Sequence, residues 1–189
     1  MWPVPVWLSE DEFATLSAAC GRLIPADETA GAVEAGVPDY IDAMLGAFLV
    51  DPPLIWAGGP SSGRFGGPEG FSRFHRLTAF DELAWRMRIE GSLGMAEREF
   101  NGPVVGWQQI YRDGLAALGS DFSQASVEEQ DARLRAGEEF TGVLYEHCCE
   151  GMYGAPEYGG NRGTVAWQAI DFLGDVQPRG FSDAEVSEP

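Results

Sequence analysis

The sequence predicts an all-α fold, a single-domain and irregular helical bundle with long Gly/Pro-rich loops over residues 1–189. Apolar residues recur at spacings of three and four along most of the chain, and no segment alternates as a half-buried strand does. Glycine and proline gather between these segments, where they end helices. With 44% hydrophobic residues, a chain of 189 residues can bury one continuous core.

The N-terminal helix has the clearest start signal. Ser9 and Glu12 form the S-x-x-E pattern of a capping box, in which each side chain bonds the other residue's backbone N–H. Apolar residues follow in steps of three and four up to Pro25, which cannot continue a helix. We therefore expect a helix over residues 9–24, preceded by an extension at residues 1–8.

Six further helices follow from the same spacing. Phe80 is expected on the apolar face of the third helix of the chain, and Thr164 is expected to cap the last. The fifth has only Val127 and Leu134 to bury, which indicates a solvated surface helix. The acidic tail at residues 183–189 is expected to fray. The six expected ranges are 38–49, 77–89, 107–118, 126–135, 140–152 and 164–170.

Two Gly-rich loops contain aromatic residues. Residues 51–71 hold six Gly and four Pro, and residues 151–163 hold five Gly. Loops of this length are commonly functional, and aromatic side chains in loops commonly anchor interfaces. Asn161 is expected to shape its own turn through side-chain bonds to the backbone, and Tyr158 and Trp167 are equally candidates for fixing the loop against the bundle. The candidate interface or loop-shaping residues are Trp56, Phe65, Tyr158, Gly159, Gly160, Asn161 and Trp167.

The charge of the chain excludes several function classes. A formal net charge of -18 repels nucleic acid and anionic lipid surfaces. All 12 basic residues are arginine, so Schiff-base chemistry and the P-loop lysine are excluded. The longest apolar run, residues 43–50, is far shorter than the ~20 residues that span a bilayer, so no direct membrane insertion is expected.

The N-terminus determines the expected location. It lacks a basic region before its apolar residues, and no two arginines are adjacent, so neither a secretory nor a twin-arginine signal is present. A cytoplasmic protein is expected, with the periplasm as the alternative if a partner carries the chain across the membrane.

No catalytic set is convincing in the sequence. Residues 59–63 match the G-x-S-x-G pattern around Ser61, but that motif needs a strand before it and a helix after it, and here it lies in a Gly/Pro loop. His75 and His147, the two histidines, show no spacing that would place one beside Ser61. Glu146, His147 and Glu150 lie within one helical turn, but no further ligand pattern completes a metal site. We therefore expect neither a metal nor a cofactor on this chain.

Three cysteines, Cys20, Cys148 and Cys149, are the candidate redox thiols. Their odd number and the absence of a C-x-x-C pair fit neither a disulfide framework nor a structural zinc site. Cys148 falls on the apolar face of its helix and reads as a small buried hydrophobe. Adjacent cysteines bridge only with strain, so a disulfide, if present, is expected to join Cys20 to Cys148 or to Cys149.

Four stretches resemble a known family. They are LIPAD at 23–27, AGVPDYID at 35–42, AWR at 84–86 with IEG at 89–91, and EGMYGAPEYGGN at 150–161 followed by Trp167. In order and spacing they are similar to the gluconate 2-dehydrogenase subunit 3 family, from about residue 9 to residue 175. The YGGN block followed by a tryptophan is the most specific part.

The resemblance implies a non-catalytic small subunit that pairs with a large FAD-dependent oxidoreductase subunit of the glucose-methanol-choline type. In such complexes the large subunit holds FAD and oxidises a sugar or sugar acid, in some cases with a cytochrome as electron acceptor, and the small subunit assists folding, stability or export. Many members carry a twin-arginine signal, and this sequence does not. Two alternatives from the residues stay open: a stand-alone hydrolase using Ser61 or thiol enzyme using Cys149, and a chaperone that binds its client only transiently.

Overall fold

Helices make up the regular secondary structure of the part of the chain that the computed structural model describes, residues 5–49, 53, 55 and 77–173. Within these residues no strand forms, and the one bridge between extended residues joins Gly91 to Val105. The predicted all-α class is confirmed, with one helical body. The α-helices are α1 (Glu10–Leu23), α2 (Val37–Leu45), α4 (Ala79–Ile89), α5 (Trp107–Leu118), α6 (Val127–Ala136), α7 (Glu138–Tyr153) and α8 (Val165–Ala169).

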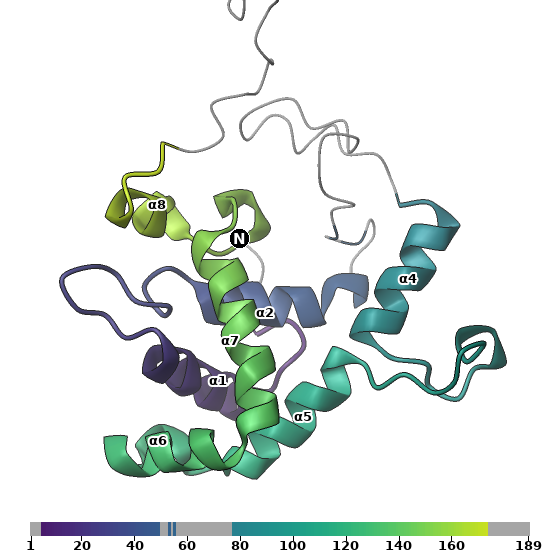
Figure 1. The fold of residues 1–189 in the computed structure, drawn as a ribbon, viewed down its shortest axis with the longest axis horizontal. Coiled ribbons are helices and arrows are strands. Elements are labelled where there is room, and N and C mark those ends of the chain that lie inside the picture. Colours follow the sequence, from purple (N-terminus) through teal and green to yellow (C-terminus); the bar gives the residue numbers. More distant parts are fainter. Residues whose placement is uncertain (1–4, 50–52, 54, 56–76, 174–189) are drawn as a thin grey trace, which may run out of the picture.

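Helix α7 is the centre of the bundle, and it contacts α1, α2, α5, α6 and α8 (Figure 1). Its buried face is the stripe Phe140, Leu144, Cys148 and Met152, which recurs every four residues as the sequence predicted. The residues that pack with this stripe in the core are Leu16, Ala19 and Cys20 from α1, Val37, Ile41 and Leu45 from α2, and Tyr111, Leu115 and Leu118 from α5. Each large apolar side chain buried there contributes roughly 1.5–3 kcal/mol to folding.

Local capping signals set where two helices begin. Ser9 and Glu12 form the predicted capping box at the start of α1, with both reciprocal bonds present. Thr78 and Asp81 form a second capping box, which starts α4 at Ala79. The helix expected from residue 77 therefore begins two residues later, because the Thr78 side chain caps it.

Helix α2 is shorter than predicted. The α-helix ends at Leu45, and the chain continues as a 3-10 turn over Ala47–Leu49. Gly46 separates the two, and a Cβ at this position would lie 2.8 Å from the Val6 side chain. The expected range 38–49 was too long because the spacing of apolar residues does not reveal that the N-terminal segment packs here.

Two predicted core positions are exposed. Val127 is 50% exposed and Phe80 is 79% exposed, so neither is buried as its spacing indicated. The residue that α6 buries beside Leu134 is Gln130, whose amide donates to the Phe122 carbonyl at 2.8 Å. A buried amide with a satisfied donor replaces the expected valine, a substitution that a hydrophobic pattern cannot indicate.

A buried carboxylate ties the N-terminal segment to the bundle. Asp42 of α2 has no exposed surface, and its oxygens accept backbone N–H groups from Val6, from Trp7 at 3.0 Å and from Leu8 at 2.8 Å. Leu8 is buried in the core directly before the α1 capping box. Asp42 thus sets the path by which the chain enters α1.

Replacing Asp42 with Asn is expected to lower the free energy of unfolding by about 1–3 kcal/mol, because an amide group would face backbone donors that the carboxylate now accepts. Urea unfolding followed by circular dichroism measures the change. Asp113→Asn is the matched control, since exposed Asp113 accepts only a side-chain bond from Gln109 among the hydrogen bonds described. Equal unfolding midpoints for the two variants would contradict the role given to Asp42.

Candidate functional site

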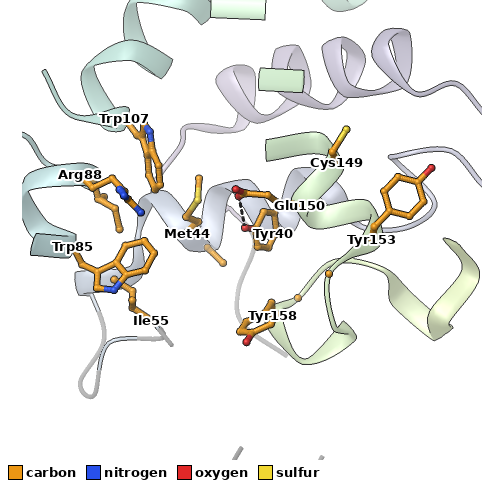
Figure 2. Close-up of a pocket in the computed structure, with 14 residues that line it drawn as sticks. Tyr40, Met44, Ile55, Trp85, Arg88, Trp107, Cys149, Glu150, Tyr153 and Tyr158 are labelled. Atoms are coloured by element: carbon orange, nitrogen blue, oxygen red, sulfur yellow. Dashed lines mark hydrogen bonds between the residues drawn. The ribbon is translucent and has the colours of Figure 1, made fainter. Parts of the chain in front are cut away.

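A groove of about 760 Å³ opens between α2, α4, α5 and the C-terminal end of α7 (Figure 2). Its walls are mostly apolar and aromatic, which is typical of sites that bind organic ligands or side chains of a partner. The lining residues are Tyr40, Ala43, Met44, Ile55, Trp85, Arg88, Ile89, Trp107, Cys149, Glu150, Tyr153, Gly154, Tyr158 and Gly159.

Helical spacing delivers these residues to one side of each helix. Tyr40, Ala43 and Met44 lie three and four residues apart on α2, as do Trp85, Arg88 and Ile89 on α4. Residues with this separation lie on the same helix face. The helices α2 and α4 therefore present two faces to the groove, and α7 contributes a third with Glu150 and Tyr153.

The carboxylate in the groove is paired with a phenol. The Tyr40 hydroxyl donates to Glu150 Oε2 at 3.1 Å (Figure 2). Burial, and then the negative charge of Glu150, raise the pKa of Tyr40. Tyr40 consequently stays a neutral donor at physiological pH, and Glu150 has a hydrogen-bond partner within the groove.

The cation in the groove lies between two indole rings. The Arg88 guanidinium carbon is 5.2 Å from the ring centre of Trp85 and 5.7 Å from that of Trp107, and the two rings are 6.4 Å apart (Figure 2). Both separations lie within the range of cation–π attraction. Arg88 therefore holds the two tryptophans in place as one wall of the groove.

The opposite end of the groove is formed by the loop that contains Tyr158 and Gly159. Gly159 has φ +104°, a conformation that glycine adopts without strain. A Cβ at Gly160 would lie 2.1 Å from the Gly151 carbonyl oxygen, and one at Gly151 would lie 2.7 Å from the Tyr40 ring. The two glycines thus let the loop backbone lie on α7, and let α7 lie on α2.

Asn161 shapes this loop through backbone hydrogen bonds. It is completely buried, its amide donates to the Gly154 carbonyl at 3.1 Å, and its Oδ1 accepts the Ala166 N–H at 3.0 Å. The second bond satisfies a free N–H at the start of α8. The expectation that Thr164 caps this helix is wrong, because Thr164 lies in a left-handed conformation and its side chain caps no N–H.

Trp167 and Arg162 attach the loop and α8 to the bundle. The Trp167 indole N–H donates to the Tyr153 carbonyl at 2.8 Å, at the end of α7. Arg162 pairs with Asp39 of α2 at 2.9 Å, and its backbone N–H donates to the Ala35 carbonyl at 3.0 Å. The segments at 35–42 and 150–162 therefore form one docked unit, although more than a hundred residues separate them.

His147 lies in the core beside Tyr111 and Trp107. Its Nδ1 is 2.9 Å from the Tyr111 hydroxyl, and its ring packs edge-on against Trp107 with centres 4.6 Å apart. Burial lowers the pKa of His147 to about 4 and raises that of Tyr111. The histidine is therefore neutral at physiological pH, and its Nδ1 accepts the tyrosine proton.

The buried position of His147 separates it from Glu146, which is exposed, and from Glu150, which bonds Tyr40. In the part of the chain that the structure describes, no group of three or more His, Cys, Asp or Glu side chains is arranged to hold a metal ion. The same residues contain no helix long and apolar enough to cross a membrane.

The cysteines divide into a core pair and a groove residue. Cys20 and Cys148 are both fully buried, which confirms the expectation for Cys148, and their Sγ atoms lie 3.6 Å apart. Cys149 is half-buried and lines the groove. No imidazole is available to activate Cys149 from the same helix, because the neighbouring His147 faces the core.

The sequence interpretation found part of this site. Tyr158 and Gly159 line the groove, whereas Gly160, Asn161 and Trp167 hold its end in place. The groove residues that it missed as site residues include Tyr40, Trp85, Trp107 and Tyr153, which read as ordinary members of helical faces. Their helical spacing was visible, but the fact that these faces meet around an open space was not. Trp56, Phe65, Ser61 and His75 lie outside the described residues.

The buried histidine is expected to make stability fall on mild acidification. The unfolded chain takes up the His147 proton near pH 6.5, and the folded chain does so only near the lowered pKa of about 4. The contribution is complete above about pH 6.5 and shrinks as the pH falls towards 4, by about 3 kcal/mol in total. The difference in unfolding free energy between the wild type and His147→Gln, measured by urea titration from pH 7 to 4, isolates this effect. A difference that does not change with pH would contradict it.

A comparison with protein families agrees with this architecture. The family model of gluconate 2-dehydrogenase subunit 3 matches residues 10–174, a span that contains the groove and the loop docked beside it. Comparison with curated proteins and with solved structures gave no match. The chain belongs to the gluconate 2-dehydrogenase subunit 3 family, the small subunit of a sugar dehydrogenase complex.

Proposed function

We propose that this chain is the non-catalytic accessory subunit of a heteromeric FAD-dependent sugar or sugar-acid dehydrogenase, and that it stabilises the large flavoprotein subunit and assists its assembly. The observation that carries the proposal is the composition of the groove. Most of its lining comes from the segments at 35–42, 84–91 and 150–161, which are the segments that resemble the family. The family motifs thus build a binding surface.

The chemistry of the groove suits a protein surface as its ligand. The polar groups of Tyr40 and Glu150 bond each other, and Arg88 lies over indole rings, so the walls offer mainly aromatic and aliphatic contact. Apolar and aromatic side chains of a partner would gain most from burial there, as interface anchors do. FAD is expected in the partner subunit, and a cytochrome is a further candidate component of the complex.

A second exposed apolar surface lies directly after α4. The loop at residues 91–105 exposes Phe100, at 93% of its surface, together with Leu93 and Val105. Arg98 braces the loop, since its guanidinium bonds Glu90 at 2.9 Å and the Gly91 carbonyl at 3.1 Å. A stable interface commonly buries about 800 Å² on each partner, and this loop extends the groove surface towards such an area.

Binding alone accounts for a stabilising role. A subunit that binds the folded flavoprotein and not the unfolded chain stabilises the folded state by mass action. At a concentration one hundred times its dissociation constant, the effect is ~2.7 kcal/mol. That is a substantial part of the stability of an ordinary domain, so no catalytic residue is required of this chain.

Co-expression with an FAD-dependent sugar dehydrogenase subunit from the same genome tests the proposal. We expect the two chains to co-elute in size-exclusion chromatography with flavin absorbance, and the flavoprotein expressed alone to be insoluble or to lose FAD. The isolated small chain is expected to oxidise no sugar. Separate elution with a soluble, active flavoprotein would contradict the proposal. A flavoprotein that becomes active through co-expression without a stable complex would indicate a transient chaperone.

Tyr153→Ala is expected to weaken the complex about tenfold or more, because it removes an aromatic wall of the groove. Tyr145→Ala is the matched control: both tyrosines belong to α7 and are similarly exposed, 47% for Tyr153 and 51% for Tyr145, but Tyr145 does not line the groove. Surface plasmon resonance on immobilised flavoprotein gives the two dissociation constants, and circular dichroism establishes that both variants fold. Equal losses for the two variants would rule out the groove as the docking site.

A further inference from the structure

The two buried cysteines join the first helix to the central one. Cys20 belongs to α1 and Cys148 to α7, helices that contact each other directly (Figure 1). The Cys148 thiol donates to the Cys20 sulfur at 3.6 Å, and neither side chain has exposed surface. Their sulfur atoms are therefore already in contact across the helix interface.

The third cysteine faces elsewhere. Successive residues of an α-helix point about 100° apart, so Cys148 and Cys149 cannot both face α1. Cys148 faces Cys20, whereas Cys149 is half-buried and lines the groove (Figure 2). Of the two pairings that the sequence left open, the structure favours Cys20 with Cys148.

We propose that Cys20 and Cys148 form a disulfide when the chain folds in an oxidising environment, while Cys149 stays a free thiol. The oxidant is a disulfide, such as oxidised glutathione or the active-site disulfide of a thiol oxidase. One cysteine thiolate attacks it and forms a mixed disulfide, releasing one thiol. The second cysteine thiolate then attacks the mixed disulfide, releasing the other thiol. The two cysteines lose two electrons and two protons, and the oxidant becomes two thiols.

The bond forms before the two helices are fully packed. The thiolate is the attacking species, and burial raises the pKa of Cys20 in the packed core. An external disulfide also has no access to two side chains without exposed surface. The folded core therefore preserves the redox state that the pair had when α1 and α7 came together.

The disulfide would stabilise the bundle without altering the groove. It closes a loop between residues 128 positions apart, and long loops lose much conformational freedom in the unfolded chain. We expect the oxidised chain to unfold roughly 5–15 °C above the reduced chain. Neither cysteine lines the groove, so binding to the flavoprotein tests a separate property.

The test is a thiol count on the full-length chain made in two bacterial hosts, one with a reducing cytoplasm and one whose cytoplasm oxidises dithiols. Lysis into iodoacetamide and denaturant labels every free thiol, and mass spectrometry with non-reducing peptide mapping locates the bond. We expect one labelled cysteine, Cys149, from the oxidising host and three from the reducing host. Cys149→Ser should form the same bond, whereas Cys148→Ser should form no bond to Cys20.

Three labelled thiols from the oxidising host would overturn the proposal, and so would a mapped bond that includes Cys149. If Cys148→Ser does not fold, the wild type and Cys149→Ser still decide the question, because both retain the pair. A bond of the expected pairing with no rise in melting temperature would overturn the stabilising effect.

Discussion

The backbone of α7 touches α2 at Gly151, and the arrangement of the site depends on this contact. Any side chain at Gly151 would overlap the Tyr40 ring, and any side chain at Gly160 would overlap the Gly151 carbonyl. Three layers of chain, α2, α7 and the following loop, are therefore stacked at backbone distance. Arg162 and Asn161 then hold the loop in that position through an ion pair and backbone hydrogen bonds.

This stacking leaves an apolar space beside it. The helices α2 and α7 meet closely at Gly151, and α4 with α5 forms the far wall through Trp85 and Trp107. The polar groups within the space interact with one another, Tyr40 with Glu150, and Arg88 with the indole rings. The result is a surface that gains free energy from apolar contact, which is the property needed in a subunit of an assembly.

Polar groups in the core stabilise the bundle because each has a partner. Asp42 accepts three backbone N–H groups, His147 accepts the Tyr111 hydroxyl, and Gln130 donates to a backbone carbonyl. Burial of a polar group is costly unless it is hydrogen-bonded. These partners are fixed by long-range packing, so these groups make stability sensitive to pH and to single isosteric changes.

The sequence by itself determined the helices, their approximate ends and the family, because capping boxes, apolar spacing and short motifs are local patterns. It was wrong about Phe80, Val127 and the cap of α8, where a neighbour distant in the chain or the solvent decides burial. Only the tertiary structure decided that Tyr40, Trp85 and Tyr153 share one groove, and that Cys20 faces Cys148. Those relations depend on how helices cross. The crossing is set by glycines whose role becomes visible only when another backbone lies against them.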